Sequence, residues 1–380
     1  RDLVRYHLEY QERLQADPHR PTYHLVSNEG PALPFDPNGA IYWNGRYHLF
    51  YIYQDPRGFV PGRKPRDEMD CWGHWSSADL VHWRQHPAGL VPGPDDPETS
   101  IYSGGACVGP DGKATIIYHG LPVGNCIATS THPLLEEWAK LATNPIVPCP
   151  TPGDEEFGIY DSWDPHIWVE NDTYYAIFGS NPERGLKATI FRSSNLTDWE
   201  YLHPIPEFDL PGVAEDDDVS CPDFFRIGDR HMLLCISHKR GARYYLGRWE
   251  DERFLPEEHH WMNWPGGNFF APESLQDHRG RRIFWAWVID RRPRSRMEEA
   301  GWSGTMSLPR ELSLAEDGSL EMRPVPELEV IRAARLHATP VETVDQSQRL
   351  AGADGDALEI VATVEPGEEA TSVTIDVRET

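Results

Sequence analysis

The fold-determining stretch reads Ala32-Leu33-Pro34-Phe35-Asp36-Pro37-Asn38-Gly39, followed after a turn by Tyr47-His48-Leu49-Phe50-Tyr51. It places one carboxylate on an apolar segment, then a turn, then a second apolar segment. Short apolar runs bounded by Gly, Pro, Asn and Asp are typical of β-strands. The same pattern recurs four more times, beginning at Ser103-Gly104-Gly105, Asp164-Pro165-His166, Cys221-Pro222-Asp223 and Ala271-Pro272-Glu273.

The repeat predicts the fold class. Its equivalent positions are spaced by roughly 50 to 70 residues, at or above the usual length of a β-propeller blade. Five such units predict an all-β protein with a five-bladed β-propeller, whose innermost strands line a central funnel. Asp residues after short strands also cap turns, which is the structural alternative. Carboxylates at matching places in several units favour an acidic site on the axis. The five positions are Asp36, Gly104, Asp164, Asp223 and Glu273.

The chain divides into three predicted parts. Residues 1–21 are charged with interspersed leucines and predict a helical arm, and residues 22–335 form the propeller. Residues 336–380 are expected to be a linker and part of another unit, because residues 357–364 and 372–377 have strand-like patterns. Those strands are too few for a stable sandwich by themselves, so either a second domain is truncated here or the strands pair with the edge of the propeller.

Charge excludes one class of partner. Among 380 residues, 35 are Lys or Arg and 61 are Asp or Glu, which gives a net charge of −26. Nucleic-acid binding needs a basic surface, so no nucleic-acid partner is expected. No apolar run approaches the roughly 20 residues that span a bilayer, so no membrane partner is expected either. The first residues do not resemble a signal peptide, but such a peptide could have been removed. The compartment, cytoplasmic or secreted, and the oligomeric state stay open.

Cysteine and histidine spacing argues against a cofactor. The six cysteines have no CxxC spacing and predict free thiols rather than a disulfide framework. The histidines form no HExxH or Cys-paired motif, and no Gly-rich phosphate loop is present. Neither a metal nor an organic cofactor is therefore expected. Three units also carry a Trp after a short polar segment, which predicts packing between blades rather than sugar stacking: Trp83, Trp138 and Trp199.

Together these motifs resemble glycoside hydrolase family 32, the β-fructofuranosidase group that includes invertases, levanases and inulinases. The resemblance runs from about Thr22 to about Arg332. The family fold is a five-bladed propeller followed by a β-sandwich, so the resemblance implies that residues 336–380 are a linker and the start of a C-terminal β-sandwich. The matching segments are Asp36-Pro37-Asn38-Gly39, Trp72-Gly73-His74, Tyr102-Ser103-Gly104, Asp164-Pro165, Cys221-Pro222-Asp223 and Gly301-Trp302-Ser303-Gly304.

The resemblance implies a retaining glycosidase, in which one carboxylate attacks the anomeric carbon and a carboxylic acid protonates the leaving oxygen. Asp36 matches the family nucleophile. Asp164 matches the residue that holds sugar hydroxyls and stabilises the transition state. The substrate would be an oligosaccharide or small glycoside. The substrate-binding residues implied are Asn38, Trp72, Tyr102, Ser103, Trp163, Ser220 and Asp223.

The chain departs from the family motif at four polar positions. The family acid/base glutamate immediately before Cys-Pro-Asp is replaced by Ser220, whose hydroxyl cannot act as a general acid near neutral pH. Phe35, Ile52 and Trp163 replace an Asn, a Gln and an Arg. A pocket that hydrogen-bonds one sugar discriminates against others, so the sugar and its linkage are left open.

Three carboxyls could replace the missing acid. Glu273 follows Phe269, Phe270, Ala271 and Pro272, and such apolar neighbours would raise its pKa. Asp218 lies two residues before Ser220 and would share its face of a strand, whereas Asp223 would point to the opposite face. Glu273 is the predicted acid; the alternative for it is an ion pair with one of the nearby arginines, such as Arg291 or Arg292. The run Glu215-Asp216-Asp217-Asp218 is expected to be a solvated loop.

The main functional prediction is hydrolysis of a furanoside or a related sugar. Two alternatives stay open: a sugar-binding propeller that has lost catalysis, and a transglycosylase in which a sugar hydroxyl replaces water.

Overall fold

The structure is a computed structural model. It describes residues 2–26, 34–55, 69–181, 183–205, 210–263, 268–335, 340–342, 348–350, 352, 355, 357–368 and 370–376. These residues separate into two compact units, Arg1–Val325 and Pro326–Thr380.

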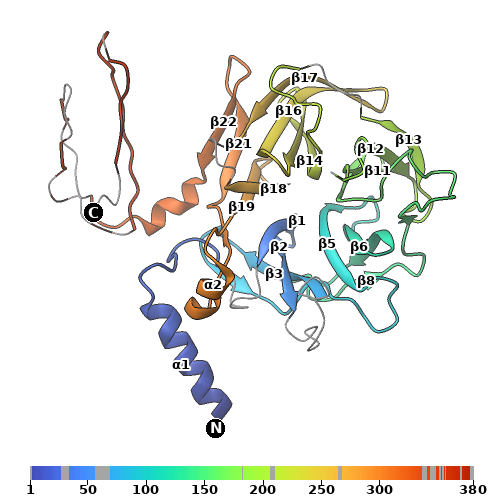
Figure 1. The fold of residues 1–380 in the computed structure, drawn as a ribbon, viewed down its shortest axis with the longest axis horizontal. Coiled ribbons are helices and arrows are strands. Elements are labelled where there is room, and N and C mark those ends of the chain that lie inside the picture. Colours follow the sequence, from blue (N-terminus) through green and yellow to red (C-terminus); the bar gives the residue numbers. More distant parts are fainter. Residues whose placement is uncertain are drawn as a thin grey trace. The chain divides into compact units, whose positions relative to one another are not determined.

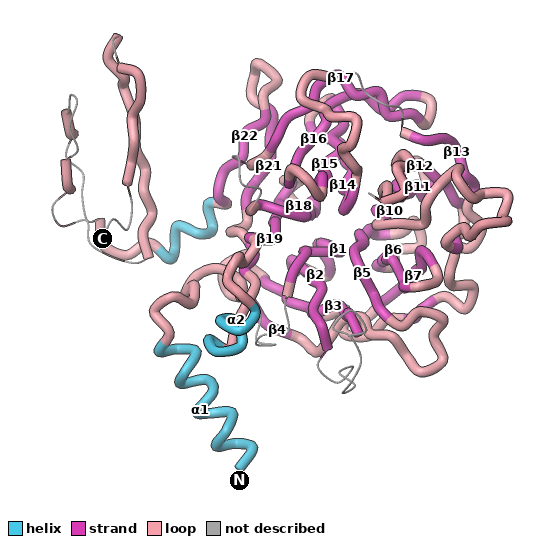
Figure 2. The backbone as a smooth tube through the Cα atoms, viewed as in Figure 1, coloured by secondary structure: helices cyan, strands magenta, loops and turns pink. Residues whose placement is uncertain are grey.

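Five antiparallel sheets arranged around a common centre make up the first unit (Figure 1). The sheets follow one another along the chain, and within each the strands are hydrogen-bonded mostly in sequence order. Figure 2 shows the same ring as a tube, with the first strand of each sheet nearest the centre. The predicted five-bladed, all-β propeller is therefore confirmed.

The first two blades contain nine strands. Blade 1 consists of β1 (Phe35–Trp43), β2 (Arg46–Asp55), β3 (Met69–Ser77) and β4 (Trp83–Gln85). Blade 2 consists of β5 (Ser100–Val108), β6 (Ala114–Leu121), β7 (Gly124–Ser130) and β8 (Ala139–Lys140), and β9 (Val147–Pro148) also pairs with β7.

The remaining three blades repeat this plan. Blade 3 consists of β10 (Pro165–Glu170), β11 (Thr173–Phe178), β12 (Thr189–Ser193) and β13 (Glu200–Pro204). Blade 4 consists of β14 (Ser220–Ile227), β15 (Arg230–Ser237), β16 (Gly241–Glu250) and β17 (Arg253–Trp261). Blade 5 consists of β18 (Phe269–Gln276), β19 (Arg282–Val288), β21 (Arg310–Leu314) and β22 (Leu320–Pro324), and β20 (Thr305–Met306) pairs with β19.

The sequence repeat marks the innermost strands. Asp36, Gly104, Asp223 and Glu273 lie on β1, β5, β14 and β18, and Asp164 directly precedes β10. In those four strands the pairing register shifts close to the repeat position, as in a β-bulge. Bulges bend a strand and re-aim a side chain, and they are common beside active sites. The inner ends of four blades therefore share one local distortion.

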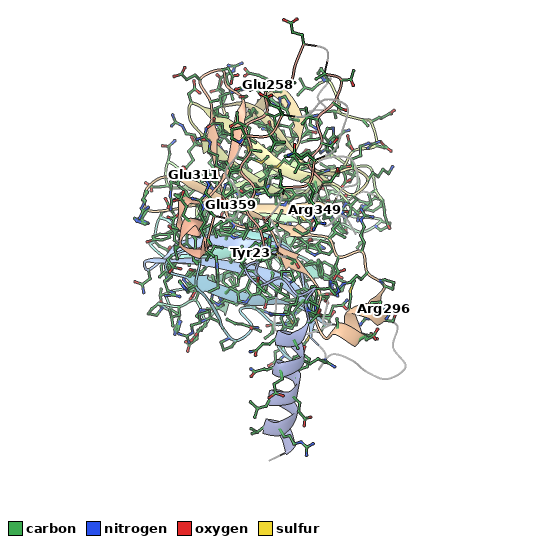
Figure 3. All side chains as sticks on the ribbon, turned by 90° about the vertical axis from the view of Figure 1, so that its left-hand side faces the viewer. Tyr23, Glu258, Arg296, Glu311, Arg349 and Glu359 are labelled. Carbon is green, nitrogen blue, oxygen red and sulfur yellow. The ribbon has the colours of Figure 1, made fainter. Side chains whose placement is uncertain are left out.

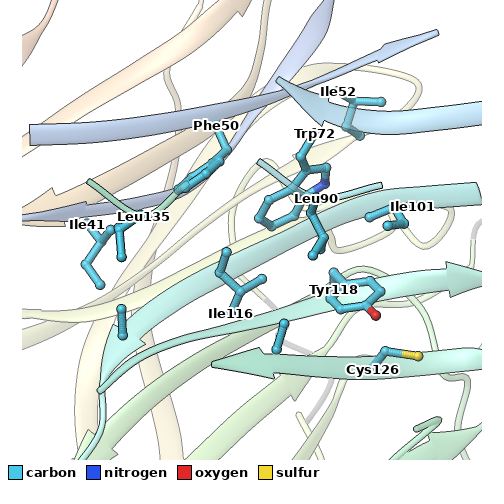
Figure 4. Close-up of a cluster of buried hydrophobic side chains, with 12 residues drawn as sticks. Ile41, Phe50, Ile52, Trp72, Leu90, Ile101, Ile116, Tyr118, Cys126 and Leu135 are labelled. Atoms are coloured by element: carbon cyan, nitrogen blue, oxygen red, sulfur yellow. The ribbon is translucent and has the colours of Figure 1, made fainter. Parts of the chain in front are cut away.

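Apolar clusters fill the spaces between neighbouring blades. The cluster between blades 1 and 2 contains Phe50 and Trp72 from blade 1 and Ile116 and Tyr118 from blade 2, each with no exposed surface (Figure 4). Similar clusters join blades 2 and 3, blades 3 and 4, and blades 4 and 5. Burial of these side chains supplies most of the driving force for stacking the sheets.

Two of the three repeated tryptophans pack against these clusters, as predicted. Trp138 packs against the cluster between blades 1 and 2, and Trp199 packs against the cluster between blades 2 and 3. Each repeated Trp donates its indole N–H to the carbonyl of a leucine three residues earlier, at 2.9 to 3.1 Å. All three leucines have positive φ, so the turn and the hydrogen bond form one recurring unit; they are Leu80, Leu135 and Leu196.

The N-terminal helix α1 (Asp2–Ala16) packs against the segment after α2 (Arg294–Ala300). Leu14, Val26 and Trp302 form a small apolar cluster. The indole of Trp302 donates to Asp17 Oδ2 at 2.7 Å. These contacts attach the predicted helical arm to blade 5.

Charged side chains cover the outer strands, including Glu258 on β17 and Glu311 on β21 (Figure 3). Many are paired across strands, as Arg230 is with Glu258 at 2.7 Å. Such exposed pairs add about 0–1 kcal/mol each, so they serve solubility more than stability.

All six cysteines are free thiols, as predicted. Of the described residues, no helix has the length and apolar character needed to cross a membrane.

The second unit begins with a 3₁₀ helix, η3 (Pro326–Ile331). In this second unit, Arg332 and Glu359 form an ion pair at 2.5 Å. The described residues 357–368 and 370–376 form no strand, so the strands predicted there are not seen; Val377 lies outside the described residues. Val361 is 85% exposed and Val373 is 56% exposed, so neither has the apolar partner surface that holds a strand in a sheet.

Candidate active site

Two carboxylates meet at the inner ends of the blades. The side chains of Asp36 and Asp164 are both buried, at 8% and 7% exposure. Cys221 lies between them: its Sγ is 3.9 Å from Asp36 Oδ2 and 3.6 Å from Asp164 Oδ2. The Cys221 backbone N–H also donates to Asp164 Oδ2 at 3.1 Å. Blade 1, blade 4 and the segment before blade 3 therefore contribute to one acidic site.

The backbone around this site is strained. Asp36 has φ of 31° and Cys221 has φ of 45°, a region that residues with a Cβ rarely occupy. Each such residue costs on the order of 1–3 kcal/mol and persists only where its surroundings enforce it. Both lie at the register shifts of β1 and β14. The bulges therefore hold Asp36 and Cys221 in conformations that a regular strand does not provide.

Asn38 and Ser103 hold Asp36 in place. Asn38 is 2% exposed; its Nδ2 donates to the Asp36 carbonyl at 2.6 Å, and its Oδ1 accepts from the Gly104 N–H at 2.9 Å. The Ser103 hydroxyl is 3.5 Å from Asp36 Oδ2. Asn38 was predicted to bind substrate, but its amide is occupied by backbone groups of two blades. Its place in the structure is that of a positioning residue.

Burial raises the pKa values of both carboxyls. Burial, with the nearby Asp164 charge, raises the pKa of Asp36 to about 7. Burial likewise raises the pKa of Asp164. Asp36 Oδ1 is buried and has no hydrogen-bond partner among the described residues. Such a group is available to a ligand that approaches the site.

The two departures from the family motif that flank Asp164 and Cys221 are in contact with each other. The Trp163 indole N–H donates to Ser220 Oγ at 3.2 Å, and Ser220 Oγ donates to Asp218 Oδ2 at 2.9 Å. Ser220 is fully buried. Asp218 in turn accepts two hydrogen bonds from His238, from Nδ1 at 2.7 Å and from the backbone N–H at 2.9 Å. The chain Trp163–Ser220–Asp218–His238 thus extends beside the two carboxylates.

His238 was missed from the sequence. It lies in the turn between β15 and β16, and no motif or spacing links it to Ser220 or Asp36. The hydrogen bond to Asp218 is the main cause that raises the pKa of His238, and the charges of Asp164 and Asp36 act in the same direction. Only the closed ring brings this imidazole to the carboxylates.

The expectation of a solvated loop for the acidic run was wrong for two of its residues. The Asp217 side chain is 1% exposed and pairs with Arg243 at 3.0 Å and Arg240 at 2.5 Å. Asp218 is 6% exposed, and the Arg243 guanidinium donates to its carbonyl. These residues are buried because arginine and histidine partners compensate their charges, which the local sequence does not reveal.

Glu273 and Asp223 belong to a different cluster, between blades 4, 5 and 1. Glu273 is 5% exposed, and its Oε1 accepts from the Ala40 N–H at 3.0 Å. Asp223 is fully buried and accepts from the Ser274 hydroxyl. Burial and the Asp223 charge raise the pKa of Glu273 well above its ordinary value, while the Arg282 guanidinium opposes that rise.

The arginine partners suggested for Glu273 were wrong. Arg292 pairs with Asp290 at 2.5 Å, and Arg291 donates to Asn268 at 2.5 Å. Arg282 is the cation near Glu273, because it lies on β19, the strand paired with β18.

Trp72 and Tyr102 belong to the apolar packing between blades 1 and 2. Trp72 has no exposed surface, and its indole N–H donates to the Tyr102 carbonyl at 2.9 Å. The structure therefore places Trp72 in the core between blades 1 and 2 and not on a substrate surface, contrary to the sequence prediction. Tyr102 is half-buried against the same cluster. Asp223, with no exposed surface, is likewise not positioned to touch a substrate.

His119 is a second residue that sequence analysis missed. Its ring lies 5.3 Å from that of Trp163, and its Nδ1 is 3.1 Å from Asn125 Oδ1. Its Nε2 is buried and has no partner among the described residues. Burial lowers the pKa of His119, while the charge of Asp164 acts in the opposite direction. No group of three His, Cys, Asp or Glu in the described part of the chain is arranged to hold a metal.

Comparisons with known proteins identify the family of the chain. The family described as "Glycosyl hydrolases family 32 N-terminal domain" matches residues 32–324. The sucrose-6-phosphate hydrolase of Klebsiella pneumoniae is 32% identical over 348 residues, which cover 85% of this chain and 70% of that protein.

Solved structures show the same fold. Fructan 1-exohydrolase IIa of Cichorium intybus has a TM-score of 0.69 at 25% identity, over 84% of this chain and 63% of that one. A β-fructofuranosidase of Bombyx mori in complex with sucrose has a TM-score of 0.68 at 26% identity, over 87% of this chain and 71% of that one. The chain thus spans less than two thirds of the chicory enzyme. With a family match across the whole propeller and these relatives, the chain belongs to glycosyl hydrolases family 32.

Proposed function

We propose that this protein is a glycosidase that cleaves β-fructofuranosides with retention of configuration. The observation that carries the proposal is the buried pair of Asp36 and Asp164 around Cys221 at the centre of the propeller. Relatives named for cleavage of sucrose 6-phosphate and of fructans support the substrate class.

Asp36 is the proposed nucleophile. Its carboxylate attacks the anomeric carbon, the glycosidic C–O bond breaks, and a covalent glycosyl-enzyme forms. The reactive form is ionised, so burial that raises the pKa of Asp36 to about 7 also makes the carboxylate a better nucleophile once charged. Positive charge that develops on the sugar during bond cleavage relieves the repulsion between Asp36 and Asp164.

Asp164 is the proposed holder of the sugar hydroxyls. One of its oxygens accepts from the Cys221 N–H, which fixes the carboxylate plane. Hydrogen bonds from sugar hydroxyls to a fixed, buried carboxylate strengthen as the transition state gains positive charge. Ser103, which contacts Asp36, and Trp163 are the proposed neighbours of the bound sugar. Ser220 is proposed to act on the sugar through Trp163 and Asp218.

Two other proposals concern the rest of the chain and its partners. Residues 336–380 are proposed to form a linker and the first strands of a β-sandwich, supported by their strand-like sequence patterns. The partner is a small glycoside or oligosaccharide. A net charge of −26 disfavours nucleic acid and anionic membrane surfaces.

A non-catalytic sugar-binding propeller is the second candidate, because Ser220 stands where the family has its acid/base glutamate. The test is turnover by purified protein on sucrose, sucrose 6-phosphate, inulin, levan and an aryl β-fructofuranoside. We expect hydrolysis of at least one of them, and Asp36→Asn should lower kcat by roughly 10³-fold or more. Reaction in aqueous methanol should give a methyl fructoside of retained configuration, and its yield also measures transfer against hydrolysis.

The matched control is Asp172→Asn, in the exposed turn between β10 and β11, which should keep wild-type rates. Sugar binding by calorimetry with no turnover on any of these substrates would favour the non-catalytic alternative.

A further inference from the structure

Cleavage of an unactivated glycosidic bond needs a proton at the leaving oxygen. In this chain the residue before Cys221 is Ser220, and its hydroxyl is already a donor to Asp218. Ser220, at the position of the missing acid, is therefore connected by hydrogen bonds to Asp218, and Asp218 to His238.

The His238 ring is held in a defined orientation. Asp218 Oδ2 accepts from Nδ1 at 2.7 Å, and Asp218 Oδ1 accepts from the His238 backbone N–H at 2.9 Å. Asp218 is itself fixed by the Ser220 hydroxyl and by Arg243, which donates to its carbonyl. Since Nδ1 is engaged, Nε2 is the nitrogen that can give a proton to a substrate. A carboxylate that orients an imidazole in this way is a common device of acid–base catalysis.

Access also suits a proton donor. The His238 side chain is 43% exposed, unlike the buried Asp36 and Asp164. The Phe270 ring lies 6.1 Å from it, in an edge-to-face arrangement. An imidazole at this place can meet a leaving group that projects toward solvent, and it can exchange its proton with water between turnovers.

We propose that His238, oriented by Asp218, is the general acid and base of this protein and replaces the glutamate whose position Ser220 occupies; this rests on the proposed function. In the first step Asp36 bonds to the anomeric carbon, the C–O bond breaks, and the leaving oxygen takes the proton of the imidazolium Nε2. In the second step the neutral Nε2 takes a proton from water, the hydroxide oxygen bonds to the anomeric carbon, and the Asp36 ester bond breaks.

Other acids fit the geometry less well. Both Asp218 oxygens accept hydrogen bonds, and although burial works against it, the bond from His238 holds the pKa of Asp218 below its usual value. Glu273 is hydrogen-bonded to the Ala40 N–H within the cluster of Asp223 and Arg282. Its carboxyl thus fastens blade 5 to blade 1.

The charge environment favours a protonated His238. Three carboxylates raise its pKa, Asp218 most strongly and then Asp164 and Asp36, against the effect of burial. The two adjacent cations, Lys239 and Arg240, are paired with Asp216 and Asp217. Activity should therefore fall as pH rises through the His238 pKa, which lies above the ordinary value of 6.5.

The test compares leaving groups in His238→Gln. On sucrose, whose leaving oxygen needs a proton, kcat should fall roughly 10²- to 10⁴-fold. On an aryl fructofuranoside with an acidic phenol, formation of the glycosyl-enzyme should change less than about tenfold, because that leaving group needs no proton. Azide should accelerate turnover of the variant by attacking the glycosyl-enzyme without base assistance. The fall of kcat/KM at alkaline pH that is expected for the wild type, the alkaline limb, should be absent in the variant.

The matched control is His82→Gln. His82 forms the same Nδ1-to-carboxylate contact with Asp79 at 2.8 Å, but its side chain is 79% exposed on the outer part of blade 1. This variant should keep wild-type rates and pH dependence. Thermal melting of both variants checks folding, and a 43% exposed side chain is not expected to be required for it.

Asp218→Asn and Glu273→Gln complete the series. Asp218→Asn should move the alkaline limb to lower pH, because the carboxylate that raises the His238 pKa is lost. Glu273→Gln should leave the alkaline limb and the leaving-group dependence unchanged. Wild-type rates and an unchanged alkaline limb in His238→Gln would overturn the inference while the proposed function stands, and a leaving-group effect in Glu273→Gln would transfer the role to Glu273. If the wild-type protein cleaves no fructoside, both fail.

Discussion

The surroundings of Asp36 lower the stability of the folded protein but suit the proposed role of its carboxylate. Its carboxylate is buried, one oxygen lacks a partner among the described residues, and Asp164 lies on the other side of Cys221. Its backbone φ of 31° adds strain. Each feature opposes folding, yet together they produce a buried carboxylate whose charge a cationic transition state would neutralise.

Asp36→Asn should stabilise the protein in a pH-dependent way. The folded pKa is about 7 and the unfolded pKa about 4, so the unfolded state ionises first as pH rises. The wild type therefore loses stability between about pH 4 and pH 7, and the loss stays constant above. Since Asn cannot ionise, its free energy of unfolding should exceed that of wild type by up to roughly 4 kcal/mol at pH 8.

Urea unfolding at pH 4 and pH 8 measures this difference, with Asp172→Asn as the exposed control. An equal effect of Asp36→Asn at the two pH values would mean that the Asp36 carboxylate is not destabilised by its surroundings.

At the scale of the strand, the inner bulges depend on close backbone approach. Gly104 on β5 is the clearest case: a Cβ there would lie 2.1 Å from the Ile117 carbonyl oxygen on β6. The Gly104 N–H also donates to Asn38, which in turn binds the Asp36 carbonyl. One glycine thus couples the pairing of blade 2 to the position of Asp36, the proposed nucleophile.

Gly104→Ala should therefore weaken both stability and activity. Pushing β5 away from β6 should cost about 1–3 kcal/mol of unfolding free energy, as overpacking usually does. The displaced Asn38 should also lower kcat on the best substrate about tenfold or more. Thermal melting and initial rates measure the two effects. The control is Gly367→Ala, where a Cβ would meet nothing within 4 Å; it should change neither stability nor rate. A wild-type rate in Gly104→Ala would show that the position of β5 does not affect the activity of the site.

At the scale of the whole molecule, the site exists only because the ring closes. Asp36, Asp164 and Cys221 come from blade 1, the segment before blade 3, and blade 4. Blade 5 meets blade 1 through hydrogen bonds from Ala40 to Glu273 and from Tyr47 to Asp277 at 3.0 and 3.1 Å. Apolar clusters between blades set the angle of each sheet, and hence the distance between carboxylates.

Trp72→Ala tests this dependence on packing between blades. The side chain is fully buried between blades 1 and 2, so its loss should cost about 3–5 kcal/mol of unfolding free energy. The hydrogen bond to the Tyr102 carbonyl is lost as well. Urea unfolding measures the change. Val108→Ala, at a side chain that is 44% exposed, should cost less than about 1 kcal/mol; similar costs for the two would argue against a shared core between these blades.

Local sequence was sufficient for much of the fold. Alternating apolar runs, turn residues and the fivefold recurrence around Asp36 predicted the propeller, its inner strands and the packing of Trp138 and Trp199. The repeat predicted that carboxylates at matching positions would gather at one centre; Asp36 and Asp164 do so around Cys221, whereas Asp223 and Glu273 form a separate cluster. Strand period and turn preference depend on near neighbours, and so they can be read from one sequence.

The sequence by itself therefore determined the architecture, while the tertiary structure decided which carboxylates meet and which other groups share their surroundings. In the folded protein Trp72 and Asp218 are buried, and Glu273 accepts a hydrogen bond from the Ala40 N–H. His238 is hydrogen-bonded to Asp218, and its pKa responds to the charges of Asp164 and Asp36. Burial and charge partners depend on residues that are distant in sequence and meet only after the blades have stacked. Because those two quantities set the pKa values and the free lone pairs, the chemistry of the site is a property of the closed ring.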